Sequence, residues 1–182
     1  MTIYISILRG INVSGHNLIK MDALRKLYED LGFQSVTTYV QSGNVVFTGN
    51  EIDVTELEQR ISQQIEKNFG YDVPVIILTL SKLKQVIDNN PLLKNHNSDI
   101  AYLHVTFLFS QPNHYDPKII EDKKLNEEEI SFSDRAIYLY CPNGYGRTKL
   151  TNNFLEAKLK VRATTRNWKT TKELFKIAQQ TI

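Results

Sequence analysis

The chain has 182 residues, of which 41% are hydrophobic and 23% are charged. These proportions are typical of a globular protein that buries a core, and they exclude wholesale disorder. The single cysteine, Cys141, excludes an intrachain disulfide and an all-cysteine metal site. No run approaches the roughly 20 apolar residues that span a bilayer, and the first apolar run is too short for a signal segment. We therefore expect a soluble cytoplasmic protein with no membrane partner.

Charge is unevenly distributed along the chain. Residues 1–50 carry four basic and three acidic side chains, a net charge of +1. Residues 51–142 carry nine basic and fifteen acidic side chains (net −6), and residues 143–182 carry nine basic and two acidic ones (net +7). The overall charge of +2 is therefore the sum of an acidic middle segment and a basic C-terminal segment. This asymmetry favours charged partners.

The first half of the chain predicts a ferredoxin-like unit. β-Branched and aromatic residues in short alternating runs indicate strands, and apolar residues at helical spacing indicate helices. The predicted strands lie at residues 3–8, 35–40, 45–48 and 73–79, and the predicted helices lie at residues 20–31 and 54–70. Gly32 supplies the left-handed stop that such a helix favours. The order strand, helix, strand, strand, helix, strand is the split βαβ unit.

The second half repeats this order approximately. It begins with a helix at residues 82–88 and a polar stretch at residues 89–99. Strands are then predicted at residues 101–109, 129–132 and 136–140 with a short extended segment at 161–164, and helices at residues 117–125, 150–159 and 168–179. We therefore expect an α+β fold in which a second, related α/β unit follows the first. The expected domains are residues 1–80 and residues 101–182, with a helix and connector at residues 81–100 between them.

Two segments of the first unit combine glycine with polar side chains. Leu8-Arg9-Gly10-Ile11-Asn12-Val13-Ser14-Gly15 follows a predicted strand, where glycines permit unusual φ angles and Arg9 offers a planar fork for phosphate or carboxylate. Gln41, Ser42 and Asn44 occupy a hairpin turn, where their side chains can donate and accept hydrogen bonds. Each segment is also explained without a ligand, as a strand-to-helix loop and as a turn with Asn and Gly at positive φ. If the turn lies beside the loop, the two frame one site.

The basic end of the chain supplies a third segment. Asn143-Gly144-Tyr145-Gly146-Arg147-Thr148-Lys149 is a glycine-rich loop before a helix, with Thr148 as the expected N-cap, and such a helix start attracts anions. Arg162-Ala163-Thr164-Thr165-Arg166-Asn167-Trp168 lies further on and predicts a phosphate or carboxylate clamp with an aromatic surface. The alternative is a capped helix start, with Trp168 in the core and both arginines solvated.

Catalytic and metal chemistry find little support in the sequence. The four histidines lack metal-ligand spacing, so no metal and no cofactor are predicted. Cys141 has no histidine near it in sequence, so a nucleophilic role would depend on tertiary proximity alone. No acidic pair suggests metal-assisted hydrolysis, and no base with an orienting partner is evident. Whether the chain is an enzyme stays open.

Three motifs in this order resemble one bacterial family, the domain of unknown function (DUF) 1697 family. The motifs are Leu8-Arg9-Gly10-Ile11-Asn12-Val13, Tyr39-Val40-Gln41-Ser42-Gly43-Asn44-Val45-Val46-Phe47 and Thr164-Thr165-Arg166-Asn167-Trp168-Lys169-Thr170. The resemblance runs over nearly the whole chain and departs at Ser14, where the family pattern usually has glycine. It implies a compact α+β protein with a ferredoxin-like first part and a related second part. It implies no established reaction, substrate or catalytic residue.

Three functional hypotheses follow. The first is a module that binds a small anionic or phosphate-bearing, nucleotide-like ligand at a cleft formed by the Arg9 loop, the Gln41–Asn44 turn and the Arg166 segment. The candidate residues for that cleft are Arg9, Asn12, Gln41, Ser42, Asn44, Arg147, Arg166 and Asn167. The second is a structural or protein-interaction role with no small ligand, and the third is an enzyme of phosphoryl or acyl transfer that uses the same cations.

Nucleic acid is a weakly supported partner. Split βαβ sheets can bind single strands through exposed aromatic residues, and the aromatic-rich signature of RNA-recognition sheets is absent here. The acidic middle of the chain would also repel a long polyanion. The sequence leaves the oligomeric state and the identity of the ligand open.

Overall fold

The computed structural model describes residues 1–96 and 99–181, and the chain divides into two compact units. Unit 1 comprises residues 1–85 and 173–182, and unit 2 comprises residues 86–172. The chain passes from one unit to the other inside helix α3 (Leu80–Asp88) and again inside helix α7 (Trp168–Gln180). The domain boundaries expected from the sequence, at residues 80 and 100, stay predictions.

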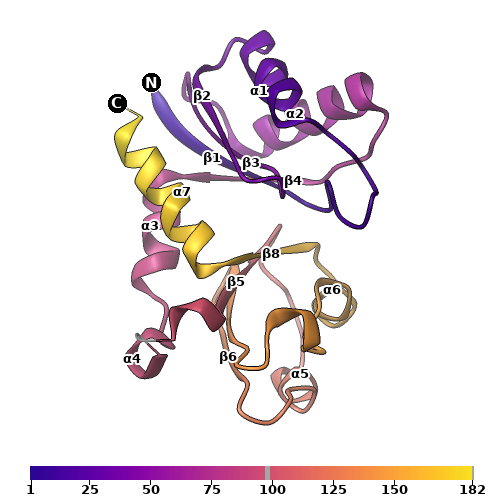
Figure 1. Cartoon of the computed structure of the whole chain (residues 1–182), viewed down its shortest axis with the longest axis vertical. Coiled ribbons are helices and arrows are strands. Elements are labelled where there is room, and N and C mark those ends of the chain that lie inside the picture. Colours follow the sequence, from indigo (N-terminus) through magenta and orange to yellow (C-terminus); the bar gives the residue numbers. More distant parts are fainter. Residues whose placement is uncertain (97–98, 182) are drawn as a thin grey trace. The chain divides into compact units, whose positions relative to one another are not determined.

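Unit 1 has the ferredoxin-like topology that the sequence predicts. Its elements are β1 (Thr2–Leu8), α1 (Met21–Asp30), β2 (Gln34–Tyr39), β3 (Asn44–Gly49), α2 (Val54–Phe69) and β4 (Val75–Thr79). The strands form one antiparallel sheet in the order β2-β3-β1-β4, with α1 and α2 on the same face (Figure 1). Gly32 and Gly70 follow the two helices with φ of 87° and 75°. The left-handed stop expected at Gly32 is therefore confirmed, and Gly70 ends the second helix in the same conformation.

Strand β1 is buried on both of its faces. Tyr4 and Leu8 point from β1 into the core beneath α1 and α2, where Tyr4 stacks on Phe47 of β3 with ring centroids 5.5 Å apart. Ile5 and Ile7 alternate with them and point to the opposite face, and they are fully buried too. A strand with two covered faces explains why the apolar run of β1 is nearly continuous.

Unit 2 repeats the same topology with a different sequence. Its elements are β5 (Leu103–Leu108), α5 (Pro117–Glu121), β6 (Glu129–Phe132), β7 (Ala136–Tyr140), α6 (Asn152–Leu159) and β8 (Ala163–Asn167). The strand order is β6-β7-β5-β8, position for position the order of unit 1, and α5 and α6 cover one face (Figure 1). Identical topology in both halves is what a duplicated βαββαβ unit would produce.

Several element boundaries in unit 2 differ from the sequence prediction. The strand expected from residue 101 begins at Leu103, because Ile100–Tyr102 form a 3-10 turn. The polar stretch at residues 89–99 contains a short helix, α4 (Leu93–His96), and residues 97–98 of that stretch lie outside the described residues. The extended segment expected at residues 161–164 is the full strand β8, which pairs with β5 through Asn167. No helix in the described part of the chain has the length and apolar character that a membrane crossing requires.

Candidate functional site

Residues 9–20 form a closed loop between β1 and α1 that is held by its own polar groups. The backbone N–H of Asn12 donates to the carbonyl of Asn17 (3.1 Å), and Nδ2 of Asn17 donates to the carbonyl of Gly10 (3.0 Å). Gly10, Asn12, Ser14 and Asn17 have φ between 48° and 73°. Glycine and asparagine tolerate this left-handed region, and Ser14 adopts it at the position where the family pattern has glycine.

The turn between β2 and β3 packs against the end of β1. The backbone N–H of Leu8 donates to the carbonyl of Gly43 (2.9 Å). Gly43 has φ of 81°, and a Cβ atom there would lie 2.5 Å from Cδ1 of Ile11. Glycine is therefore required at this position by the backbone conformation and by the close approach of the loop.

The remaining turn residues correct the expectation for Asn44. Asn44 does not occupy the turn at positive φ, because it is the buried first residue of β3. Its Nδ2 donates to the carbonyl of Tyr39 (2.9 Å) and to Oγ of Ser42 (3.1 Å). Val40 adopts the positive φ instead, at 51°, which is a rare conformation for a β-branched residue.

The Asn12 side chain joins the loop to the turn. Its Nδ2 donates both to the carbonyl of Ile19 (2.9 Å) and to the carbonyl of Gln41 (2.8 Å), and its Oδ1 accepts from the backbone N–H of Ile19 (2.9 Å). The first two sequence segments are therefore one structural feature, which we call the loop–turn cluster (residues 8–19 and 40–44). The Asn12 carboxamide makes its bonds to main chain, so its role is to hold the cluster together.

The predicted site residues at the loop–turn cluster also include Arg9, Gln41 and Ser42, and Oγ of Ser42 accepts the hydrogen bond from Asn44. Arg9 and Ser42 are half-buried and Gln41 is exposed. The backbone N–H of Arg9 donates to the carbonyl of Pro74 (3.0 Å), which fixes the start of the loop beside β4. A hollow of about 460 Å³ in unit 1 lies beside β2, and residues of the loop–turn cluster do not line it.

Arg166 lies on β8 in unit 2, opposite Val105 of β5 in the sheet register. Its side chain is only 7% exposed, and Nη1 donates to Oγ1 of Thr164 and to the carbonyl of Thr165, each at 3.0 Å. Burial lowers the pKa of the Arg166 guanidinium to about 10, and the nearby Tyr145 opposes that shift. The group still carries its positive charge at neutral pH, although it is almost fully buried.

Tyr145 connects the two predicted segments of unit 2. It lies in the 3-10 turn Tyr145–Arg147 (η2), stacks on the ring of His104 with centroids 4.8 Å apart, and interacts electrostatically with Arg166. Burial lowers the pKa of His104, while a hydrogen bond to the carbonyl of Tyr102 opposes the shift, so the imidazole is neutral at pH 7. Tyr145 and His104 are not among the predicted site residues, although Tyr145 stands between two glycines in the predicted loop. Arg147 lies in the same turn and is exposed.

The helix starts near these segments are capped by residues other than Thr148. Oγ1 of Thr151 accepts from the backbone N–H of Phe154 (3.2 Å) and is the N-cap of α6. The expected cap, Thr148, bonds the N–H of Leu150 instead. Leu150 and Leu155 are buried in one cluster, one on each side of the cap, an arrangement that places the cap three residues later than predicted and the helix start two residues later.

Asn167 is a helix cap as well. Its Oδ1 accepts from the backbone N–H of Thr170 (2.7 Å) at the start of α7, and its backbone carbonyl accepts from Oγ1 of Thr171 (3.0 Å). The side chain is exposed. Trp168, next in the chain, is buried, as the structural interpretation of this segment expects.

The remaining chemical candidates do not form a reactive site. Cys141 is buried, and burial together with the nearby Glu128 raises the pKa of its thiol to about 12. A thiol with such a pKa is a poor nucleophile at neutral pH. Among residues 1–96 and 99–181, no group of three or more His, Cys, Asp and Glu side chains could hold a metal ion.

The predicted site residues thus fall into two groups. Arg9, Asn12, Gln41, Ser42 and Asn44 come together in unit 1. In unit 2, Tyr145 interacts with Arg166, Arg147 shares the 3-10 turn of Tyr145, and Asn167 follows Arg166 at the start of α7. That all eight residues line one cleft stays a prediction.

Comparison with known proteins identifies the family of the chain. No curated protein matches it. A solved structure, that of a conserved bacterial protein from Streptococcus pneumoniae, is similar over 97% of this chain and 98% of the other, with a TM-score of 0.74 and 23% sequence identity. This similarity shows that the fold is shared.

The family model described as a protein of unknown function, DUF1697, matches residues 1–138. The matched region contains the loop–turn cluster and ends before the motif at residues 164–170. It covers three quarters of the chain. The chain therefore belongs to the DUF1697 family, as its motifs predicted.

Proposed function

We propose that the protein binds a small anionic, phosphate-bearing ligand of the nucleotide-like class, with Arg9 of the loop–turn cluster as a principal contact. The observation that carries this proposal is the Asn12 clamp, because it holds the Arg9 loop against the Gln41–Ser42 turn. Residues 9–20 contain Arg9 and Lys20 and no acidic residue. A guanidinium presented by a fixed loop near hydroxyl and amide groups suits the oxygen atoms of a phosphate.

Arg166 in unit 2 is a separate candidate for contact with an anionic group, within its own unit. A buried guanidinium acts through a low local dielectric, so its attraction for a negative group exceeds that of a solvated arginine. Tyr145 adds an aromatic ring beside it. Asn12, Asn44 and Asn167 are removed from the list of direct contacts, because their carboxamides bond to main chain or to Ser42.

The proposal is tested by calorimetric titration of the full chain with pyrophosphate and with ATP. We expect saturable binding that falls shallowly with salt, since a small ligand makes few phosphate contacts. Arg9→Ala should weaken binding by about tenfold or more, the effect of losing one charge-assisted hydrogen bond. Arg9→Lys keeps the charge without the planar fork and should bind with intermediate affinity.

Arg25→Ala is the matched control for Arg9. Arg25 is an exposed arginine on α1 whose nearest carboxylate is Asp22 at 3.7 Å, and its removal should leave the affinity unchanged. Far-UV circular dichroism and the melting temperature show whether each variant is folded. Absence of binding to either probe, or equal weakening by Arg9→Ala and Arg25→Ala, would contradict the proposal.

A second candidate function is a structural or protein-interaction role without a small ligand. The observation that favours it is that the motif asparagines Asn12, Asn44 and Asn167 all serve the fold. Arg166→Ala separates the two candidates. Under this alternative, Arg166→Ala lowers the melting temperature by several degrees. Neither the unchanged chain nor the variant then binds pyrophosphate or ATP.

A further inference from the structure

Exposed apolar side chains gather at two places on the molecule. Scattered exposed apolar residues are normal on a soluble protein, whereas grouped ones mark interaction surfaces. The large hydrophobic side chains that are exposed among the described residues are Met1, Val13, Leu18, Val40, Ile100, Tyr102 and Ile119. Five of these seven fall into two groups, one in unit 1 and one in unit 2.

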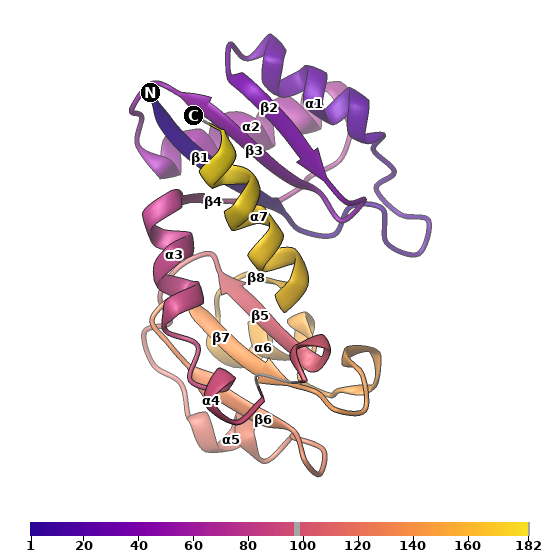
Figure 2. The same ribbon diagram turned by 60° about the vertical axis from the view of Figure 1, so that its left-hand side comes forward.

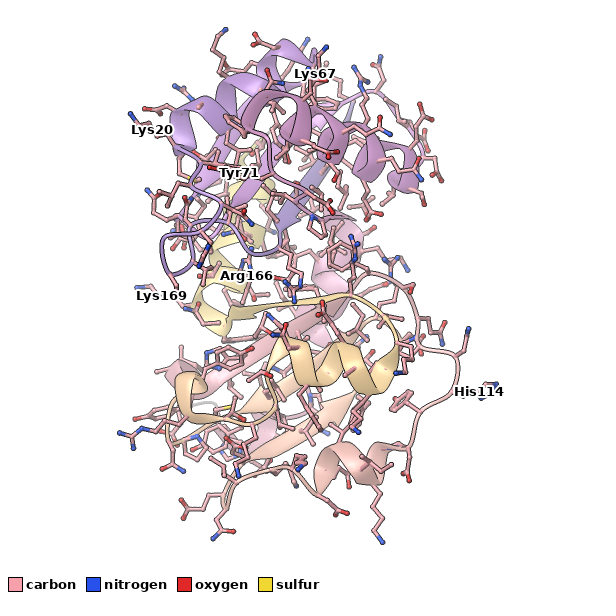
Figure 3. All side chains as sticks on the ribbon, turned by 90° about the vertical axis from the view of Figure 1, so that its right-hand side faces the viewer. Lys20, Lys67, Tyr71, His114, Arg166 and Lys169 are labelled. Carbon is pink, nitrogen blue, oxygen red and sulfur yellow. The ribbon has the colours of Figure 1, made fainter. Side chains whose placement is uncertain are left out.

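The group in unit 1 lies on the loop–turn cluster. Val13, Leu18 and Val40 are 56%, 61% and 46% exposed. The Asn12 side chain ties the main chain of Ile19 to that of Gln41, and Leu18 and Val40 are the residues that precede these two in the chain. We call Val13, Leu18, Val40 and Lys20 the basic patch. Lys20 extends into solvent at the end of the loop (Figure 3).

The loop and the turn that carry the basic patch contain no acidic residue. Residues 9–20 and 39–44 include two full positive charges and no carboxylate. The first acidic residue after the loop, Asp22, is on α1 near Arg25 at 3.7 Å. An incoming surface therefore meets aliphatic side chains beside the exposed ammonium group of Lys20.

The group in unit 2 has the opposite charge. Ile100 and Tyr102 are 45% and 41% exposed. Asp99 precedes them, and Asp99, Glu127 and Glu129 all raise the pKa of Tyr140, whose ring meets that of Tyr102 at 6.3 Å. These carboxylates therefore surround the same place, which we call the acidic patch (Asp99, Ile100, Tyr102, Glu127 and Glu129). Its nearby histidine, His96, bonds Glu129 at 2.8 Å.

We propose that the basic patch of one copy docks on the acidic patch of a second copy of this chain. Each patch offers exposed apolar side chains, and their charges are complementary, so the contact buries apolar surface and brings opposite charges together. The contact is heterologous, because it joins different surfaces of the two copies. Both patches are small, so the association is weak and is populated at high protein concentration. This proposal is independent of anion binding.

The test is sedimentation velocity of the full chain over a concentration series at low and at high ionic strength. We expect a rise in the average sedimentation coefficient with concentration at low salt, reduced at high salt because ions screen exposed charges. Lys20→Glu and Glu127→Lys should each abolish that rise. The double variant Lys20→Glu/Glu127→Lys should restore it, because the charges of the two patches are exchanged.

Lys67→Glu is the matched control for the change of charge. Lys67 is an exposed lysine of α2 outside the basic patch (Figure 3), so the variant should associate like the unchanged chain. Leu18→Ser tests the apolar part and should weaken association at both salt concentrations. The proposal is overturned if the chain stays monomeric throughout at low salt, if Lys20→Glu behaves like Lys67→Glu, or if the folded double variant stays monomeric.

Discussion

Gly43 is the residue at which the loop–turn cluster is packed most closely. A methyl group there would lie 2.5 Å from Cδ1 of Ile11 and 3.0 Å from Cβ of Leu8, on a backbone with φ of 81°. Gly43→Ala should therefore lower the free energy of unfolding by about 3 kcal/mol or more, the sum of left-handed strain and overpacking. Urea denaturation measures the loss.

Gly15→Ala isolates the backbone part of that effect. Gly15 has a nearly equal φ of 77°, and a Cβ atom there would meet no heavy atom within 4 Å. The expected loss is about 1 kcal/mol. Equal losses for the two alanine variants would show that the packing of Ile11 against the turn contributes nothing to stability.

Cys141 makes the stability of unit 2 sensitive to alkaline pH. Its folded pKa is raised from 9.0 to about 12, mainly by burial. As pH rises, the thiol therefore ionises in the unfolded chain before it ionises in the folded one. Its contribution to the free energy of unfolding is fully present below pH 9 and is lost as pH rises towards 12. Relative to Cys141→Ala, the unchanged chain should lose stability by up to about 1.4 kcal/mol per pH unit in that window.

The measurement is urea denaturation of both chains at several pH values between 7 and 11. Tyr138, whose pKa burial raises to about 12, titrates in both chains and cancels in the difference. If the two chains lose stability in parallel above pH 9, the Cys141 thiol is not the group that titrates.

At the level of elements, α7 depends on the cap that Asn167 provides. Oδ1 of Asn167 accepts from the N–H of Thr170 at 2.7 Å. Asn167→Ala should cost about 1 kcal/mol of stability, whereas Asn167→Asp should retain the cap, since a carboxylate accepts the same bond and suits a helix N-terminus. Thermal unfolding measures both. Equal destabilisation by the two variants would contradict the capping role.

The same pair of variants also bears on anion binding. If Asn167 touched the ligand, Asp would repel a phosphate and binding would fall in a variant of normal stability. Because its carboxamide bonds the main chain of α7, we expect Asn167→Asp to affect pyrophosphate binding less than Arg9→Ala does. A larger effect would return Asn167 to the direct contacts.

Most of the fold could be predicted from the sequence, since local patterns decide it. The hairpin strands β6 and β7 have the predicted bounds, and Gly32 and Gly70 stop their helices as expected. The start of α6 was predicted wrongly, because Leu150 and Leu155, buried in one cluster on each side of the cap, select Thr151 over Thr148. Tertiary packing determines which threonine caps the helix, and a single sequence does not reveal that packing.

The candidate site was predicted less completely than the fold. Residue type indicated which segments hold polar groups, and the adjacency of loop and turn could be suggested from their places in the split βαβ unit. The sequence could not predict which of these side chains bond to main chain. Asn12 and Asn44 would use the same N–H donors to hold a turn as to bind a ligand. Tyr145 and His104 meet only after β5 and η2 are placed together.

On the scale of the whole molecule, unit 1 is completed by the end of the chain. Residues 173–182 belong to it although α7 begins in unit 2. This part of α7 lies beside β1 in both ribbon views (Figures 1 and 2), and Leu174 and Ala178 in it are fully buried. Gln180 and Thr181 line the hollow beside β2. Unit 1 therefore includes two pieces of chain far apart in the sequence.

A chain ending at Lys172 should therefore lose much of the stability of unit 1. Removal of Leu174 and Ala178 takes two fully buried apolar side chains from unit 1. A fully buried leucine alone contributes about 1.5–3 kcal/mol, a large part of the stability of a small domain. Hydrogen exchange should show lost protection of the β1–β4 amides. A chain ending at Gln179 keeps both residues and should exchange like the full chain. Retained protection in the Lys172 truncation would mean that residues 1–85 fold without the C-terminal segment.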